Sequence, residues 1–528
     1  MSQPVTTVVA MARDTENSMA NATTMNRETT PPHALMWFRD DLRLQDNQAL
    51  TWLSDWCRGQ AGEPEGRGPG EKSPQKPTLL ALFIHEDPAA TGIRAPGQAA
   101  HFWQQRSLAS LREALVDHGV PLIEAHGDPT VIIPDLVARN NIQAVAWNRR
   151  YHQPAIAVDA QVKNALASQD TQATQDTQIS QANHTPPEVH SFPGYLLTEP
   201  WAVTTTTGTP YKVFTPFGKA AFQYVQEHFA DPLPALRLPG PGVNHHIEMG
   251  EWGGGGGVAN KEEPTWAAAM LNHHEPGEQG AQLRLNALDL RGYTEQRDFP
   301  AYEATSNLSA HLRFGEVSPA QVWARAADIA EEHPEQAEEV DAFLRQLLWR
   351  DFAWHRLYHL PNLATDNVRQ QFNNFPWAWP DSNPQAAADV RAWQRGQTGI
   401  AIVDAGMREL WATGTMHNRV RMIVGSLLTK NLGVHWRVGE EWFWDTLVDA
   451  DHASNPFNWQ WVAGCGDDAS PYFRIFNPVT QQKRFDPDGH YVARWVPEGA
   501  RNSAPIVDLK QSRAAALEAY ELMKATAP

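Results

Sequence analysis

The densest run of aromatic residues constrains this 528-residue chain more than any other feature. Eleven of its 21 tryptophans lie between Trp349 and Trp461, where they alternate with arginine, asparagine, aspartate and histidine. A helical core built only for stability has little use for so many polar side chains, because each buried polar group needs a hydrogen-bond partner. The stretch from Val403 to Pro478 therefore predicts a buried polar site walled by indoles.

Composition limits the class of protein. At 528 residues and 42% hydrophobic composition, the chain can hold two or three globular domains. No apolar run reaches the roughly 18 residues of a membrane span. Residues 1–32 are polar and lack the basic and apolar regions of a signal peptide, which predicts a disordered tail. The two cysteines, Cys57 and Cys465, exclude a disulfide scaffold and a four-cysteine metal site, and they favour a cytoplasmic protein.

The charge distribution bears on nucleic-acid binding. A formal net charge of −18 argues against charge-driven binding over the whole surface. It leaves room for a local basic face, because several arginines fall in the C-terminal half of the chain. They include Arg345, Arg350, Arg356, Arg408, Arg419, Arg421 and Arg474.

Residues 33–205 predict an α/β domain. Short apolar runs alternate there with segments of helical spacing, which is typical of parallel βαβ units with helices on both faces of the sheet. The expected strands are 34–38, 78–84, 120–125 and 144–147, and the helices between them are 99–118 and 129–140. The pattern therefore indicates a Rossmann-like parallel sheet.

Two loop insertions, 58–77 and 168–187, interrupt this domain, and a connector is expected at 206–282. The first insertion contains GPGEKS, but it lacks the Gly-Lys-Ser/Thr ending of a phosphate-binding loop. In the connector, the adjacent residues His273 and His274 have no third ligand nearby, so we expect no metal site.

Residues 283–505 predict a second, all-α domain, followed by a C-terminal tail at 506–528. The expected helices are 283–297, 318–332, 338–359, 399–413, 416–432 and 440–450. On the helix 338–359, Gln346, Trp349 and Arg350 share one face. An amide, an indole and a guanidinium suit a flipped-out base and its phosphate, although a core-flanking helix with an outward arginine explains them as well.

A second polar face is expected on the helix 416–432, where Asn418, Arg421 and Met422 have helical spacing. Asp449 and Asp451 follow at the end of the helix 440–450, where buried carboxylates need donors. Arg421 is the candidate partner for one of them. A structural ion pair and a site for ribose hydroxyls or a ring N–H of a nucleotide cofactor both remain open.

Several long motifs together resemble the photolyase/cryptochrome family. The resemblance runs from about residue 34 to 498, outside the two insertions, and is greatest to bacterial cyclobutane pyrimidine dimer photolyases of classes I and III. The motifs are MWFRDDLRLQDNQAL (36–50), RDFPAYEATSNLS (297–309), HLRFGEVSPAQVW (311–323), LLWRDF (347–352), TGIAIVDAGMREL (398–410), HNRVRM (417–422), DAD (449–451) and the segment from NWQW through GCGDDASPYFRIFNP.

The resemblance implies that the helical domain binds FAD. It also implies a monomeric, metal-free carbon–carbon lyase that uses blue light to repair cyclobutane dimers in UV-damaged DNA, by electron transfer from reduced flavin to the flipped-out lesion. A cryptochrome-type photoreceptor with little or no repair activity is the alternative. The positions that match FAD contacts are Tyr293, Thr305, Ser306, Leu308, Ser309, Arg350, Arg421, Asp449, Asp451 and Asn455. Asn455 matches the position beside flavin N5, where plant cryptochromes carry aspartate, and this favours repair.

The resemblance also assigns an electron relay, a lesion pocket and DNA contacts. The relay would comprise Trp459, Trp436 and Trp377, with Trp379 as a competing choice for the outer position. The lesion pocket would be lined by Gln346, Trp349, Asn418, Met422 and Trp461. DNA would be held by Arg297, Arg350, Asn418, Arg419 and Arg474.

Three positions depart from the family's pattern. Gln346 stands where dimer photolyases usually have glutamate, and it cannot offer a proton. Photolyases for (6-4) lesions also have glutamine there, but they carry histidines at the positions of Asn418 and Met422. Asn307 replaces a common arginine. The motif WNRRY (147–151) matches class III antenna sites, which implies 5,10-methenyltetrahydrofolate, although His152 replaces an acidic residue.

Overall fold

The computed structural model describes residues 32–60, 77–168, 186–234, 236, 238, 247–250, 269–468, 474–501 and 503–526. The predicted N-terminal tail and most of both predicted insertions lie outside these ranges. None of the helices in the described ranges combines the length and the apolar character that a membrane crossing needs.

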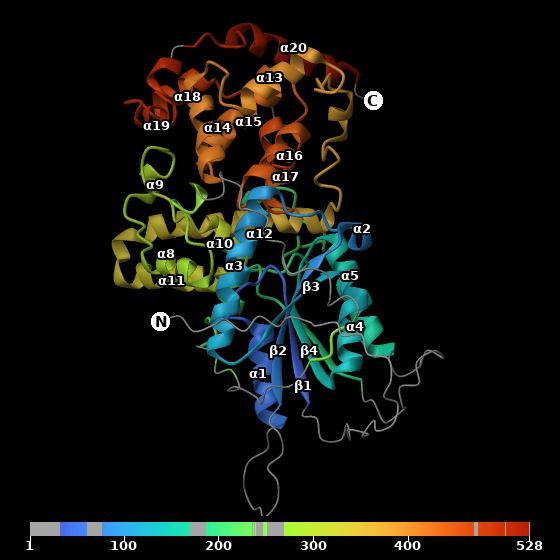
Figure 1. Cartoon of the computed structure of the whole chain (residues 1–528). Coiled ribbons are helices and arrows are strands. Elements are labelled where there is room, and N and C mark those ends of the chain that lie inside the picture. The colour runs from blue at the N-terminus through green and yellow to red at the C-terminus, as the bar shows by residue number, and fades with distance from the viewer. Residues whose placement is uncertain are drawn as a thin grey trace, which may run out of the picture.

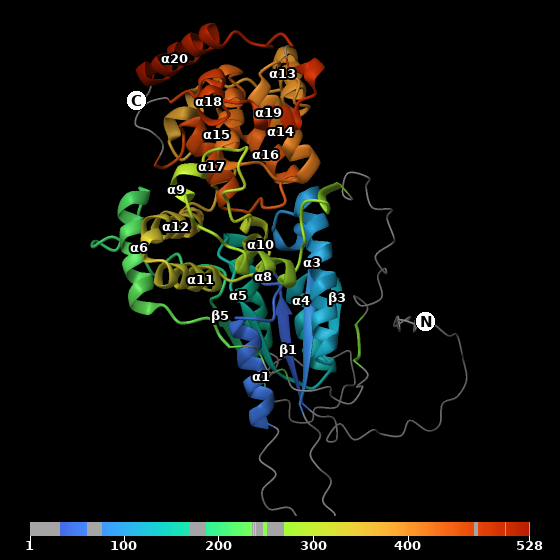
Figure 2. The same cartoon turned by 90° about the vertical axis from the view of Figure 1, so that its left-hand side faces the viewer.

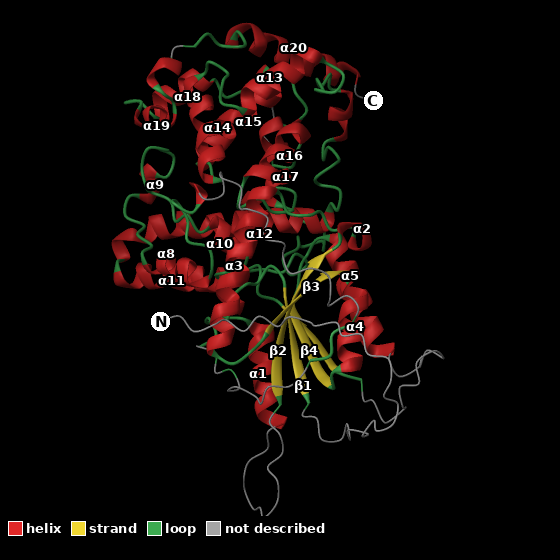
Figure 3. Cartoon of the chain, viewed as in Figure 1, coloured by secondary structure: helices red, strands yellow, loops and turns green. Residues whose placement is uncertain are grey.

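A parallel sheet forms the first domain, as the alternating pattern predicted. Its five strands run in the order β3-β2-β1-β4-β5, and every neighbouring pair is parallel. They are β1 (His33–Phe38), β2 (Thr78–Glu86), β3 (Leu122–Gly127), β4 (Ile142–Asn148) and β5 (Glu188–Phe192). Figure 3 shows these strands gathered in one half of the molecule. The central strand β1 is buried along its whole length, because helices cover both faces.

Alternate side chains of β1 enter two separate cores. Ala34, Met36 and Phe38 pack with helices α1 (Gln48–Gln60) and α3 (Gln98–Asp117). Leu35 and Trp37 pack on the other face with α4 (Pro129–Arg139) and α5 (Gln153–Ala167). This two-sided burial explains why the strand reads as a continuous apolar run.

The second domain is helical and stands against the carboxyl-terminal end of the sheet (Figure 1). The long helix α12 (Ala337–His359) crosses between the sheet and the C-terminal helices, which are orange and red in Figure 1. The other helices of this domain and of the segment before it are α6 (Phe214–His228), α8 (Glu278–Asn286), α9 (Tyr293–Gln296), α10 (Ser309–Arg313), α11 (Pro319–Glu332), α13 (Pro384–Gln394), α14 (Ala401–Thr413), α15 (Asn418–Ser426), α16 (Trp436–Thr446), α17 (Ser454–Ala463), α18 (Pro478–Phe485), α19 (His490–Trp495) and α20 (Leu509–Thr526). The short helix α2 (Pro88–Thr91) belongs to the α/β domain. A π-helical turn, Leu427–Asn431, continues α15.

Three segments differ from the sequence prediction. The expected helix 283–297 is interrupted, because α8 ends at Asn286 and α9 begins only at Tyr293. The expected connector 206–282 contains α6, which lies beside α12 (Figure 2). Its Phe214 and Phe217 pack on Phe352 of α12. The expected C-terminal tail contains α20, which buries Ala516 and Met523 in the core of the helical domain. Both helices have an apolar stripe that finds its partner only in the tertiary structure, so their local sequence alone looked like linker.

Candidate functional site

A cavity of about 300 Å³ lies inside the helical domain and gathers most of the predicted site residues. The cavity is bounded by α12, α15 and α17 and by the segments around α9, α10 and the end of α16. The predicted residues that line it are Tyr293, Thr305, Ser306, Leu308, Ser309, Gln346, Arg350, Asn418, Arg421, Met422, Asp449, Asp451, Asn455, Trp459 and Trp461. The remaining predicted residues, Arg297, Trp349, Trp377, Arg419, Trp436 and Arg474, are not part of its lining. The Trp-rich stretch therefore forms one side of a cavity with polar and apolar lining, to which Trp459 and Trp461 contribute indoles.

Arg421 and Asp449 form a paired charge in the cavity wall. Arg421 donates Nη1–H to Asp449 Oδ1 at 3.1 Å and Nη2–H to Oδ2 at 2.9 Å, and its Nε–H donates to the backbone oxygen of Met416. Burial raises the pKa of Asp449, but the Arg421 guanidinium and a hydrogen bond from Ser309 together lower it further than burial raises it, so the pKa lies below its usual range. The pairing expected for one of the two carboxylates thus belongs to Asp449.

Asp451 has a different role in the fold. Its carboxylate accepts hydrogen bonds from the backbone N–H groups of Ala453 and Ser454, at 2.7 and 2.5 Å, and from the Ser454 hydroxyl at 2.7 Å. These contacts fix the first turn of α17. Because Asp451 also lines the cavity, the bonds hold the carboxylate in one orientation at its wall.

A hydrogen-bond relay from the first domain orients Asn455. The Asn455 side-chain amide donates to the Glu440 side chain at 2.8 Å and to the Glu440 backbone oxygen at 3.0 Å. Glu440, on α16, also accepts from Arg94 of the α/β domain at 2.8 Å. Burial raises the pKa of Glu440, and Arg94 opposes that rise. The sequence analysis did not predict the contacts of Asn455 with Glu440 or of Glu440 with Arg94. Arg94 and Glu440 are 346 residues apart in the chain.

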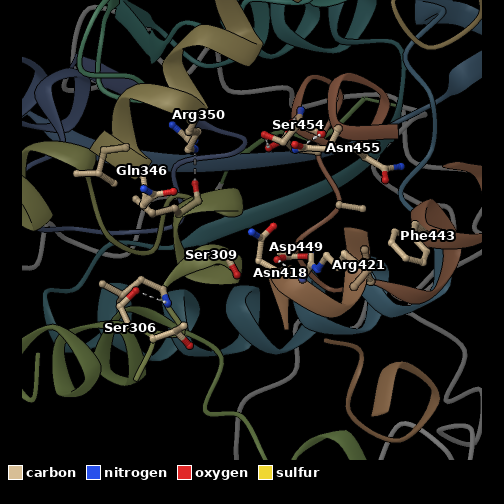
Figure 4. A pocket seen from close by; sticks show the side chains of 18 of the residues that line it. Ser306, Ser309, Gln346, Arg350, Asn418, Arg421, Phe443, Asp449, Ser454 and Asn455 are labelled. Carbon is tan, nitrogen blue, oxygen red and sulfur yellow. Dashed lines mark hydrogen bonds and ion pairs between the residues drawn. The ribbon is translucent and has the colours of Figure 1, made fainter. Parts of the chain in front are cut away.

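Hydroxyl groups gather at another part of the wall, where Ser306 and Ser309 face the cavity (Figure 4). Asn307 lies between these two residues and adopts φ of 53°, the left-handed region that asparagine tolerates better than most residues. The departure from the family's arginine at this position therefore suits the backbone.

Gln346 and Trp349 diverge although they share a helix. Gln346 accepts a hydrogen bond from Arg297 at 3.1 Å and donates to the backbone oxygen of Ala342 at 3.0 Å. Trp349 stacks on Phe214 of α6 with ring centroids 3.6 Å apart and planes 9° from parallel. One face of the Trp349 indole is therefore covered by a helix that the sequence had predicted to be connector.

The predicted DNA-contacting arginines have different surroundings. Arg419 pairs with Asp298 and lies over the Phe485 ring at 4.3 Å. Arg350 donates to the backbone oxygens of Tyr195 at 2.6 Å and Leu312 at 3.1 Å. Arg474 is exposed, and its backbone oxygen accepts a hydrogen bond from Lys430.

The predicted relay begins at Trp459, which lines the cavity and lies against Gly439 of α16. A Cβ added at Gly439 would stand 2.1 Å from Trp459 Cη2, so glycine is required there. Trp436 is completely buried and donates its indole N–H to Asn367 at 2.8 Å. Trp377 donates to the Phe372 backbone oxygen. Sequence reasoning missed Gly439 and Asn367.

No group of three or more His, Cys, Asp or Glu side chains within the described ranges is arranged to hold a metal ion. His274, one of the two adjacent histidines, contacts the Thr413 backbone oxygen instead. The polar groups at the cavity are hydroxyls, the Arg421–Asp449 pair, the Asp451 carboxylate, the Arg350 guanidinium, carboxamides and indoles. Such a set suits a large organic molecule that carries hydroxyl or phosphate groups and a flat ring.

Comparison with known proteins gives consistent matches along the chain. Residues 34–238 match the family profile described as DNA photolyase, and residues 343–504 match the FAD binding domain of DNA photolyase. The deoxyribodipyrimidine photo-lyase of Agrobacterium fabrum is 38% identical over 95% of this chain and all of its own length. Cryptochrome-2 of Arabidopsis thaliana is 31% identical over 88% of this chain and 71% of its own. A bacterial class III photolyase structure from Agrobacterium tumefaciens superimposes with a TM-score of 0.77 at 36% identity, covering 96% of this chain and 100% of that one.

Proposed function

The chain belongs to the DNA photolyase family, and from that premise we propose that it repairs cyclobutane pyrimidine dimers in UV-damaged DNA. One observation carries the proposal. A single cavity is lined both by residues expected at the cofactor, such as Asp449 and Asn455, and by residues expected at the lesion, such as Met422 and Trp461. Light-driven electron transfer to a flipped-out dimer needs this proximity.

The cavity residues fit FAD, the cofactor of the family's helical domain. Ser306 and Ser309 would serve its phosphate and ribose groups, and the Arg421–Asp449 pair its ring system, since each presents suitable donors or acceptors. When bound, reduced FAD supplies a light-activated one-electron donor. The protein's share of the chemistry is then to hold this donor close to the lesion and to fix the hydrogen bonds around it.

Asn455 is the residue best prepared for that task. Its side-chain Nδ2 donates two hydrogen bonds to Glu440, so the carboxamide oxygen is the atom left to accept from the cofactor. An amide oxygen can accept from a ring N–H but cannot supply a proton. This property supports repair over signalling.

The lesion would enter between a polar and an apolar wall. Met422 and Trp461 replace the stacking that a flipped-out dimer loses, and Asn418 offers an amide to the pyrimidine carbonyls. Gln346 stands beside them with its oxygen held by Arg297. Trp349 would close one side of this pocket. The flanking phosphates would be bound by Arg297, Arg350, Arg419 and Arg474, with Asn418 as a further contact.

An antenna of 5,10-methenyltetrahydrofolate in the α/β domain remains part of the proposal. The motif 147–151 supports it, at the carboxyl-terminal end of β4. His152 is buried and stacks on His452 of the helical domain with ring centroids 4.2 Å apart. The antenna would therefore be bound by other side chains of that edge.

A cryptochrome-type photoreceptor is the second candidate. Its support is the similarity to a plant cryptochrome together with Gln346 in place of glutamate. Under this alternative, light would change the binding of a partner and repair would be weak or absent.

The deciding experiment uses UV-irradiated thymine oligonucleotide and chemically reduced protein. We expect intact thymines to return under blue light and not in the dark. The variant Asn418→Ala should lower the yield, because it removes a hydrogen bond to the dimer worth about 1 kcal/mol. If no thymine is restored in the light by the wild-type protein, the repair function is wrong and the photoreceptor alternative stands.

A further inference from the structure

His435 contacts three tryptophans at the outer end of the predicted relay. Its imidazole stacks on Trp379 with centroids 4.3 Å apart and planes 21° from parallel. It meets Trp377 edge-on at 5.2 Å and lies 5.4 Å from the ring of Trp436, the next residue. The imidazole is therefore in contact with the middle indole and with both candidates for the outer position.

The backbone holds this arrangement in register. Ala378 donates its N–H to the Gly433 oxygen at 2.9 Å, and His435 donates its own to the Ala378 oxygen at 3.2 Å. In an extended segment, residues two apart point to the same side, so Trp377 and Trp379 both face His435. Trp379 is 38% exposed, whereas Trp436 is completely buried. The rings of Trp436, His435 and Trp379 thus connect the core of the domain to solvent.

The imidazole is held as a neutral ring with a defined tautomer. His435 Nδ1 accepts the backbone N–H of Arg437 at 3.1 Å, so the ring proton resides on Nε2. Burial lowers the pKa of His435 to about 4, with Arg437 acting in the same direction. An uncharged ring between the indoles does not repel the positive charge that an oxidised indole carries.

We infer that His435 is a positioning residue that joins Trp436 to two outer indoles, Trp377 and Trp379, so that the relay has two outlets. The inference rests on the proposed light-driven electron transfer and extends it to a residue outside the tryptophan chain. An electron that leaves Trp459 for the cofactor is replaced by one from Trp436, which is replaced in turn from the outer pair. A thiol in solution then returns one electron to the oxidised outer indole, and it releases one proton as it becomes a thiyl radical.

A simpler role for His435 is to cap α16, and His417 makes the same cap on α15. Two substitutions separate capping from bridging. His435→Asn keeps a good capping side chain and removes the ring, whereas His435→Phe keeps a ring and removes the cap. His417→Asn is the matched control, because it makes the same change on a helix whose capping histidine lies away from the outer pair.

The experiment follows flavin photoreduction by a thiol in the FAD-loaded protein, and transient absorption of tryptophan radicals. We expect His435→Asn to lose most of the photoreduction rate and to shorten the lifetime of the outermost radical, with an unchanged unfolding midpoint. His435→Phe should keep most of the rate despite a lower midpoint, and His417→Asn should photoreduce like the wild type. Trp377→Phe and Trp379→Phe should each lose part of the rate, and the double variant most of it.

Two results would overturn the inference. One is wild-type photoreduction in His435→Asn, and the other is a complete loss in Trp377→Phe or in Trp379→Phe alone. Chemically reduced His435→Asn should repair dimers like the wild type, because that assay bypasses the relay. Failure of repair in every chemically reduced sample would contradict the proposed function, whereas the photoreduction series would still decide the role of His435.

Discussion

Helices α15 and α16 begin with the same four-residue pattern, His-x-Arg-Val, at 417–420 and 435–438. In each, the histidine accepts the backbone N–H of the arginine two residues later, at 3.2 Å in α15 and 3.1 Å in α16. The backbone angles of the two histidines agree, with φ and ψ of −56° and 135° for His417 and −59° and 137° for His435. The two helices therefore have the same histidine N-cap.

The positions that follow serve different purposes. Asn418 lines the cavity, whereas its counterpart Trp436 is completely buried and belongs to the proposed relay. Arg421 pairs with Asp449, whereas its counterpart Gly439 makes room for Trp459. The same cap thus begins both helices. The residues in their first turns have different roles because each helix packs against different, distant segments of the chain.

The largest difference between the two helices is expected from the substitution Arg421→Ala on α15. Asp449 is almost buried, with 7% of its side chain exposed, so removing its partner leaves an unpaired carboxylate in the cavity wall. We expect a loss of about 3 kcal/mol in the free energy of unfolding and a low FAD content after purification. Urea unfolding and the flavin absorption per protein would measure both.

The control for this change is Arg437→Ala on α16. Arg437 pairs with Glu441 at 3.5 Å on the surface, and such a pair contributes about 0.5 kcal/mol or less. Similar losses in the two variants would show that the Arg421–Asp449 pair is not the special feature of α15.

The next largest effect is expected from Gly439→Ala on α16. The added methyl group would stand 2.1 Å from the Trp459 ring, so the ring or the helix must move. We expect a loss of roughly 1–2 kcal/mol, because overpacking outweighs the gain in helix propensity, together with slower photoreduction. Gly425→Ala on α15 is the matched control, since its nearest contact is a Val462 methyl at 3.0 Å. Equal stability of both variants would contradict the close fit at Gly439.

A smaller effect is expected from acid on the two caps. Burial lowers the pKa values of His417 and His435 to about 4, below the unfolded value of about 6.5. Between pH 6.5 and 4 these two histidines are therefore protonated in the unfolded chain and neutral in the folded protein. The free energy of unfolding falls as the pH falls through this window. We expect His417→Asn and His435→Asn each to remove about 1 kcal/mol of this loss at pH 5, after allowance for solvent screening. Urea midpoints at pH 7 and 5 would test it, and an unchanged pH dependence in both variants would contradict it.

Local sequence predicted those parts of the molecule whose partners are also local. The apolar runs indicated the first four strands of the chain, β1 to β4, and helical spacing placed Gln346 and Arg350 at one cavity. Helical spacing also placed Trp349 on the same face of α12 as Gln346 and Arg350, but the Trp349 indole stacks on Phe214 of α6. Asp451 was left open between an ion pair and a ligand, and its partners proved to be Ala453 and Ser454.

Contacts between distant segments could not be predicted in this way. The link from Arg94 through Glu440 to Asn455 joins two domains, and neither end has a pattern that identifies the other. The same holds for Gly439 and Trp459, whose fit depends on how α16 crosses α17. The repeated His-x-Arg-Val pattern was visible in the sequence, and it was the one available indication of the caps and of His435.

The smallest expected effect is that of Gln346→Glu on α12. This change alters the cavity that α15 lines and leaves α16 untouched. The new carboxylate would accept a charge-assisted bond from Arg297, which already donates to Gln346 at 3.1 Å. Because this site is only half-buried, stability should change by less than about 1 kcal/mol. We expect a higher repair yield per absorbed photon at a pH low enough to protonate the new side chain, since only the neutral carboxyl group can supply a proton to the dimer carbonyl. The photoreduction rate should be unchanged, since α16 and its tryptophans are untouched. Yields from chemically reduced protein at matched absorbance would measure the effect, with Gln346→Ala as the control that lacks both the amide and the acid. An unchanged or lower yield would mean that the amide, held by Arg297, already suits its substrate, and that the proton of a carboxyl group is not what limits repair in this cavity.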